Sequence, residues 1–277
     1  MILKTIISLS LLVSFSAAYS SEDRLSFCEK EGENFGNGQG RDVIPYECVE
    51  LFKKTAPLEA VKTSSNGKIS AYGFRNVVFI KQNERMRIIA GSYTELEEIV
   101  AIAIDETNQE LAVLNKKGDV LFYSSRITGN VAPLRVLKHK DLHGASDLVI
   151  DSKKNEVLIL NKNNRSLFFF SRLANDNGPE KKKKLNVLRI IRNLAGHESV
   201  SIDVEHGELF TLNIIKNSIH VFDLNSSSPS MSPVRIMASP AGIQNPRKVE
   251  YSASKDEIVL TNVEGKTANL PRLPTVK

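Results

Sequence analysis

The chain contains 277 residues, of which 41% are hydrophobic and 25% are charged, and it has 15 Gly, 10 Pro, two Cys and no Trp. This composition excludes a disordered chain, a collagen-like or linker protein and a disulfide-dense mini-domain. The formal net charge of +5 at pH 7 points to no particular partner, and the length allows one large domain or two small ones.

Residues Met1–Ser20 have the pattern of a secretory signal peptide. Lys4 supplies the positive charge, and Thr5–Phe15 is an apolar stretch that is too short to span a membrane. Small residues follow, and they suit cleavage after Ser20, with cleavage after Ala18 as the alternative. An uncleaved amphipathic anchor is the competing interpretation. The sequence predicts export, either to the periplasm or out of the cell, of a mature protein without a membrane span.

The next segment, residues 21–56, contains both cysteines, Cys28 and Cys48, with 19 residues between them. In an oxidising compartment such a pair is most simply one disulfide, which would contribute roughly 3 kcal/mol in the chain-entropy model. A metal site is the alternative, but two thiols without a nearby His make a poor zinc site. We therefore expect a short N-terminal segment that is closed by a disulfide.

An internal repeat occupies the rest of the chain. Four segments begin with a two-residue signature, have Glu five residues later, and have Asn five residues after that. The signatures are Ile104-Asp105, Ile150-Asp151, Ile202-Asp203 and Tyr251-Ser252. The Glu positions are Glu110, Glu156, Glu208 and Glu257, and the Asn positions are Asn115, Asn161, Asn213 and Asn262. An Arg followed by apolar residues also recurs, at Arg87, Arg135, Arg189 and Arg235. The Asn spacings of 46, 52 and 49 residues fit a unit of four short strands.

Units of this kind bury their faces by stacking around an axis, as in a β-propeller. We expect an all-β propeller over residues 57–277, with five blades of about four short antiparallel strands. Three units are full and two are incomplete: the first has expected strands at 68–72, 77–80 and 85–89, and the last lacks a clear fourth strand. A strand from Val43–Val61 is expected to close the ring on the last unit, although Glu47–Lys54 is equally typical of a short helix. An open β-solenoid is the alternative.

The repeat resembles that of secreted bacterial β-propellers of the YVTN and NHL-like kind. The clearest matches are the segments from Asp105 to Asn115 and from Asp203 to Asn213, with Gly129–Arg135 as a further segment of that style. The resemblance covers about residues 60–277, and the sequence departs from it at Ser252 and at Leu270-Pro271. Because that superfamily includes binding modules, lactonases and other hydrolases, the resemblance implies the architecture and leaves the function open.

Residues that recur in every unit are expected to have structural roles. The repeated Asp should accept hydrogen bonds from backbone amides at a turn, the repeated Asn should tolerate a left-handed turn, and the repeated Glu should end that turn. The repeated Arg is expected to pair with carboxylates on a neighbouring blade or at the surface.

Functional residues are expected where the units differ, in the loops that enter the innermost strands. Those loops contain Glu97 together with Glu98, His143, His197, Glu198 and Arg247. We expect these side chains at the mouth of the axial channel, where two His and the Glu residues could hold a divalent metal and polarise an ester or lactone. The competing interpretation is that they are ordinary exposed loop residues. The other histidines, His139, His206 and His220, fall in positions typical of the surface.

No catalytic motif was found: the chain has no H-E-x-x-H, G-x-S-x-G or P-loop sequence. The four lysines Lys181–Lys184 form one isolated tract, which favours a solvated loop over a nucleic-acid site. We therefore expect an exported, non-enzymatic binding or scaffolding module without a cofactor, whose partner is a protein or another envelope ligand. A metal-dependent hydrolase of the lactonase or esterase type is the alternative.

Overall fold

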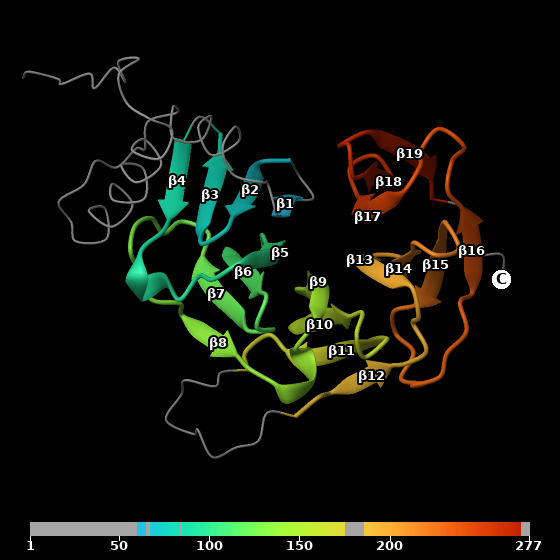
Figure 1. Ribbon diagram of the computed structural model, residues 1–277, viewed down its shortest axis with the longest axis horizontal. Helices are drawn as coiled ribbons and strands as arrows, with labels where there is room; N and C mark the ends of the chain where they lie inside the picture. The colour runs from blue at the N-terminus through green and yellow to red at the C-terminus, as the bar shows by residue number, and fades with distance from the viewer. Residues whose placement is uncertain (1–59, 65–66, 84, 175–185, 273–277) are drawn as a thin grey trace, which may run out of the picture.

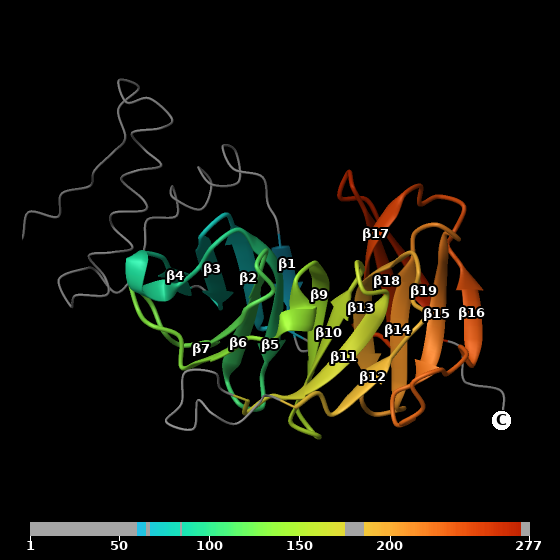
Figure 2. The ribbon, with the colours of Figure 1, turned by 60° about the horizontal axis from the view of Figure 1, so that its bottom comes forward.

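The computed structural model describes residues 60–64, 67–83, 85–174 and 186–272. Within these residues nineteen strands form five antiparallel sheets, the blades, which follow one another around a centre (Figures 1 and 2). The expected all-β propeller with five blades is therefore confirmed. Among the described residues the only helices are two single turns, η1 (Ser92–Thr94) and η2 (Lys140–Leu142), and neither approaches the length and apolarity needed to cross a membrane.

The blades contain the following strands, in chain order and from the inside of the ring outward. Blade 1 contains β1 (Ala60–Thr63), β2 (Ile69–Phe74), β3 (Val77–Gln82) and β4 (Arg85–Ile89). Blade 2 contains β5 (Ile99–Asp105), β6 (Glu110–Asn115), β7 (Val120–Ser124) and β8 (Arg135–Leu137). Blade 3 contains β9 (Ala145–Asp151), β10 (Glu156–Asn161), β11 (Ser166–Ser171) and β12 (Arg189–Ile191). Blade 4 contains β13 (His197–Asp203), β14 (Glu208–Asn213), β15 (Ser218–Asp223) and β16 (Arg235–Ala238). Blade 5 contains β17 (Pro246–Ser252), β18 (Glu257–Asn262) and β19 (Thr267–Pro271).

The core lies between successive blades. Because side chains alternate along a strand, each blade has two faces, and each face can pack against a different neighbour. Four apolar clusters fill the spaces between blades 1 and 2, 2 and 3, 3 and 4, and 4 and 5. The third strands supply large aromatic side chains to them, such as Phe122 in β7 and Phe169 in β11, both fully buried. Stacking around an axis therefore buries the faces that a single short sheet would expose.

The turn between the first and second strands explains the repeated Asp. The Asp105 carboxylate accepts the backbone N–H of Asn108 at 3.0 Å, and that of Asp151 accepts the N–H of Lys154 at 3.1 Å. The residue before the repeated Glu has a left-handed backbone, as at Gln109 with a φ of 55°. The expected structural role of the Asp is confirmed, since its carboxylate accepts a backbone N–H at the start of both turns.

The repeated Asn acts differently from the expectation. Asn115 and Asn161 are buried, and neither has a positive φ. The Asn161 side chain accepts the N–H of Asn163 at 2.9 Å and donates to the carbonyl of His143 at 2.9 Å. The Asn therefore holds the turn through its side chain and ties it to the loop that enters the inner strand.

In blades 2–4 the repeated Arg pairs with the repeated Glu of its own blade, whereas a carboxylate on a neighbouring blade or at the surface was expected. Arg135 donates two hydrogen bonds to Glu110, at 2.7 and 2.6 Å, and its guanidinium lies 4.1 Å from the centre of the Phe122 ring. The same pair forms between Arg189 and Glu156 at 3.2 Å. Each pair bridges the second and fourth strands across one face of the sheet, where it covers the third-strand side chain.

A different arginine connects neighbouring blades. Arg172, just after β11, reaches back to blade 2, where it contacts Glu110 and lies 3.5 Å from Asp105. Leu224 stands at the equivalent place in blade 4, since both residues donate their N–H to the carbonyl before the repeated Glu. Asp151, the partner that an arginine there would meet, has one buried carboxylate oxygen without a hydrogen bond. Blades 2 and 3 are thus joined by a charge cluster in addition to apolar packing, whereas at the equivalent place between blades 3 and 4 Leu224 packs in an apolar cluster.

The first and last blades meet through polar side chains. Lys62 in β1 forms an ion pair with Glu250 in β17 at 3.0 Å, and Lys248 donates to the carbonyl of Val61. β1 pairs with β2, so it completes blade 1 and corrects the expectation that this unit lacks its first strand. Within the described chain no fourth strand covers β19, and a closing strand drawn from residues before Ala60 lies outside the described residues. The signal peptide, Cys28, Cys48 and the Lys181–Lys184 tract also lie outside them.

Candidate functional site

A cavity of about 650 Å³ opens on the axis of the ring. It lies where the inner strands end, because its walls come from the last residues of the inner strands and from the turns that follow them. Ile104, Ile150 and Ile202 occupy the same repeat position in three successive blades and are all half-buried on this wall. Hydroxyl groups of Ser and Thr from the following turns surround these apolar side chains, so the cavity offers both apolar contact and hydrogen bonding.

One charged part of the wall is the contact between blades 1 and 5. Glu250 lies between Lys62 at 3.0 Å and Lys248 at 3.6 Å. Burial opposes ionisation of this carboxyl, but the charges of the two lysines outweigh it and hold the pKa of Glu250 below its ordinary value. On the cavity wall, the negative charge of Glu250 is thus balanced by two lysines, and Lys62 is already paired with that carboxylate. Neither is positioned as a free acid or base.

The residues that the sequence placed at the channel mouth lie at the opposite end of the inner strands. None of Glu98, His143, His197, Glu198 and Arg247 lines the cavity. Two of them form an ion pair, Glu198 with Arg247 at 3.1 Å, across blades 4 and 5. Glu98 pairs with Lys116 at 2.7 Å on the surface, as Glu97 does with Lys117.

The two histidines of this set have separate environments. The His143 side chain is exposed, and the residue contributes its backbone carbonyl to Asn161. His197 is 3% exposed, and its Nδ1 lies 2.7 Å from the Thr211 hydroxyl. Among the described residues this set forms no group close enough to share a metal ion. The structure therefore provides no geometry for the metal-dependent hydrolase alternative in this part of the chain.

His197 faces a second buried histidine. His220 was expected at the surface, but it is buried, and its ring meets that of His197 edge to face with 4.8 Å between centroids. Burial is the main cause that lowers the pKa of both rings, to about 4 for His197. Charge repulsion from a protonated His220 and from Lys216 lowers the pKa of His197 further. Both imidazoles are therefore neutral near pH 7, inside blade 4.

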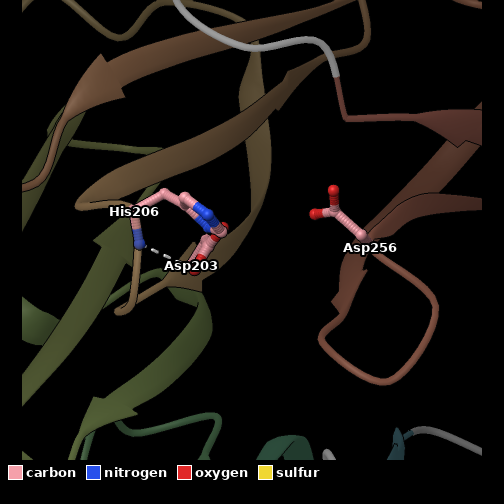
Figure 3. Close-up of side chains that lie close together, drawn as sticks. All are labelled: Asp203, His206 and Asp256. Carbon is pink, nitrogen blue, oxygen red and sulfur yellow. Dashed lines mark hydrogen bonds and ion pairs between the residues drawn. The ribbon is translucent and has the colours of Figure 1, made fainter.

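One group of carboxylates and a histidine does come together elsewhere. Asp203, His206 and Asp256 place ligand atoms within 4.8 Å of one another, between blades 4 and 5 (Figure 3). Arg272 lies in the same place, with Nε 2.6 Å from Asp256 and 3.4 Å from Asp203. Its hydrogen bond is the main cause that lowers the pKa of Asp256. Because this guanidinium already supplies the positive charge that a metal ion would bring, the group is a salt-bridge cluster between blades.

The cavity residues were visible in the sequence as a pattern, but not as a site. Ile104, Ile150 and Ile202 are the residues just before the repeated Asp, so the repeat itself marked them. The candidate residues expected from the sequence were those where the units differ, and these lie at the other end of the strands. No sequence pattern marked Lys62 as a cavity residue, because only closure of the ring brings β1 next to β17.

Comparison with known proteins identifies the fold and nothing finer. No family model matches the chain, and no curated protein matches it. Among solved structures 1517 chains match, so the architecture is a common one. One is a chain in the crystal structure of a mitotic checkpoint complex, with a TM-score of 0.53 and 15% sequence identity. The match covers 79% of this chain and 62% of that one, and an identity this low shows the fold alone.

Proposed function

We propose that this chain is an exported binding or scaffolding module that recognises a protein or another envelope ligand through the axial cavity. The observation that carries the proposal is the cavity itself, whose apolar wall is repeated over three blades and is surrounded by hydroxyl groups. Binding sites typically combine an apolar lining with a few polar groups that orient the ligand. The propeller fold commonly serves such a role, and Lys62 and Glu250 on the wall are engaged in an ion pair with each other.

The proposal is tested by filling the cavity. Thr107→Arg places a long charged side chain at the rim from an exposed turn, and Ile150→Asp places a charge on the apolar wall. We expect either change to weaken capture of the partner from an envelope extract by tenfold or more, because the Arg side chain obstructs the cavity and the Asp charge must be desolvated when a ligand covers it. Ile215→Asp is the matched control, since Ile215 is 78% exposed and does not line the cavity.

The readout is the amount of each captured protein, compared by quantitative mass spectrometry across the three variants and the unchanged chain. Thermal unfolding of each variant checks that it is folded, and Thr107→Arg keeps the test valid if Ile150→Asp is not. Capture that is unaffected by both cavity variants, or reduced equally by Ile215→Asp, would refute the cavity as the binding site.

Export and the disulfide are proposed together. Expression of the full chain with secretion should yield a mature protein that begins after Ser20, or after Ala18. Under non-reducing conditions its mass should be lower by two hydrogen atoms than after reduction, because Cys28 and Cys48 are bridged. Intact-mass measurement checks both points. An unprocessed N-terminus would contradict export, and an unchanged mass on reduction would contradict the disulfide.

A further inference from the structure

The end of the ring opposite the cavity carries basic residues in all of its turns. Because the strands of each blade are antiparallel, the turns between second and third strands all lie at this end. Each of the five turns has at least one exposed basic residue, namely Arg75, Lys116, Lys162, Lys216 and Lys266. The blades stand side by side around the axis, so these turns share one face of the molecule (Figure 1). This face can therefore approach a flat, negatively charged surface.

Ion pairs offset part of this charge in blades 2 and 5. Lys116 pairs with Glu98 at 2.7 Å, and Lys266 pairs with Glu264 at 3.2 Å. The positive charge is therefore greatest on blades 3 and 4. The exposed basic residues there are Lys162, Arg165, Arg192 and Lys216. The acidic residues beside them are Asp141 and Glu198, and Glu198 is already paired with Arg247 at 3.1 Å.

Backbone hydrogen bonds join this sector into one surface. Leu194 donates its N–H to the carbonyl of Arg165 at 2.9 Å, and Ile214 donates its N–H to the carbonyl of Gly196 at 2.9 Å. The second turn of blade 3, the loop that follows β12 and the second turn of blade 4 are therefore neighbours. We call this surface the turn face, which comprises residues 162–165, 192–198 and 214–217.

An exposed apolar side chain stands among these charges. The second turns of blades 3 and 4 have the same length, and in both the fourth residue has a left-handed backbone, with a φ of 51° at Arg165 and 48° at Asn217. Ile215 occupies the place that Asn163 has in blade 3, and it is 78% exposed. Because the turn of blade 3 forms with a polar residue there, the fold does not require an apolar one.

We propose that the turn face docks the protein on a bilayer that contains anionic phospholipids. Ile215 enters the boundary between headgroups and acyl chains, where apolar side chains of peripheral proteins are buried. Lys162, Arg165 and Lys216 lie against the lipid phosphates, because an anionic surface attracts basic residues at short range. An acidic protein would satisfy the charges alone, whereas a bilayer also accommodates an apolar side chain at the tip of a turn.

Binding is measured by co-sedimentation of the full mature protein with vesicles of about three parts phosphatidylcholine to one part phosphatidylglycerol. We expect binding to these vesicles, none to phosphatidylcholine alone, and a loss of binding as salt rises from about 0.05 M to about 0.5 M. Lys162→Gln and Lys216→Gln should each weaken binding about fivefold. Ile215→Asn, which copies the turn of blade 3, should weaken it by about fivefold or more.

A second readout reports insertion directly. The chain has no Trp, so Ile215→Trp introduces one fluorophore at the tip of the turn. Its emission should shift to shorter wavelength when the vesicles are added, because the indole leaves water for the bilayer interface. Thr107→Trp is the matched variant at the cavity end, where Thr107 is exposed, and its emission should not shift.

Two controls separate the turn face from other positive charges. Lys255→Gln removes an exposed basic residue from the β17–β18 turn, at the cavity end, and should leave binding unchanged. Replacement of Lys181–Lys184 by four Gln tests the lysine tract, which lies outside the described residues, and in that background Ile215→Asn should still weaken binding. The turn face is independent of the axial cavity, since none of its residues lines it, so Thr107→Arg should bind the vesicles normally.

Three results would overturn the proposal. The first is the absence of binding of the full mature protein to the anionic vesicles. The second is binding that Lys162→Gln, Lys216→Gln and Ile215→Asn all leave unchanged, or an emission of Ile215→Trp that does not shift. The third is equally tight binding to soluble polyglutamate that Ile215→Asn leaves unchanged, because an acidic protein would then be the partner.

Discussion

Replacement of Arg172 by Ala is expected to lower the free energy of unfolding by about 3 kcal/mol. Arg172 is 7% exposed at its side chain and contacts Glu110 and Asp105 of the preceding blade. Removal of one member of a buried charge cluster leaves the others desolvated and unpaired, which costs about 3–5 kcal/mol. Because Glu110 keeps its bonds to Arg135, we expect the lower end of this range.

Two further variants separate charge from packing. Arg172→Leu copies the natural residue at the equivalent place in blade 4, Leu224, and restores apolar volume without the charge. It should remain destabilised, because Asp105 still loses its partner. Arg192→Ala is the control, since Arg192 is exposed and no side-chain contact was found for it within the described chain. Urea unfolding measures all three, and a loss below about 1 kcal/mol for both Arg172 variants would show that the cluster does not join the blades.

Acidification is expected to destabilise the protein through blade 4, by about 2–3 kcal/mol between about pH 7.5 and about pH 4.5. The pKa of His197 is about 4 in the folded protein, mainly because of burial. In the unfolded chain it is about 6.5. The unfolded chain therefore binds the proton more tightly, so this contribution is complete above about pH 6.5 and is lost as the pH falls toward 4.

The histidine contribution is measured as a difference, because many carboxylates also titrate at low pH. His197→Gln keeps a polar group near the Thr211 hydroxyl but removes the titration. Its free energy of unfolding should fall less steeply with acid than that of the unchanged protein. His143→Gln, with an exposed side chain, should follow the unchanged protein. Parallel curves for the unchanged protein and His197→Gln would show that the buried ring is not the sensor.

Most of the fold could be predicted from the sequence, because its cause is local and repeated. The Asp–Glu–Asn spacing recurs because every blade needs the same turns, as the contacts of Asp105 and Asn161 show. Short β-branched and aromatic segments between these turns are too short for helices and become strands. The sequence missed β1, since four residues of Ala60–Thr63 carry no repeat signature.

The site could not be predicted, because it depends on which strand ends meet around the axis. His197 follows a polar loop and begins a strand, as an exposed residue would, yet it is buried against His220 from β15, two strands away in the same sheet. Likewise, Glu110 is paired in both its own blade and the next, and only the second contact needs the ring.

The sequence by itself predicted five repeat units, the strands that carry the repeat and the turns that join them, because these follow from side-chain alternation and from hydrogen bonds within a few residues. Only the tertiary structure decided where the cavity opens and which charges join the blades. Those features arise from contacts between residues far apart in the chain, such as Lys62 with Glu250, and such contacts exist only once the blades close around a common axis.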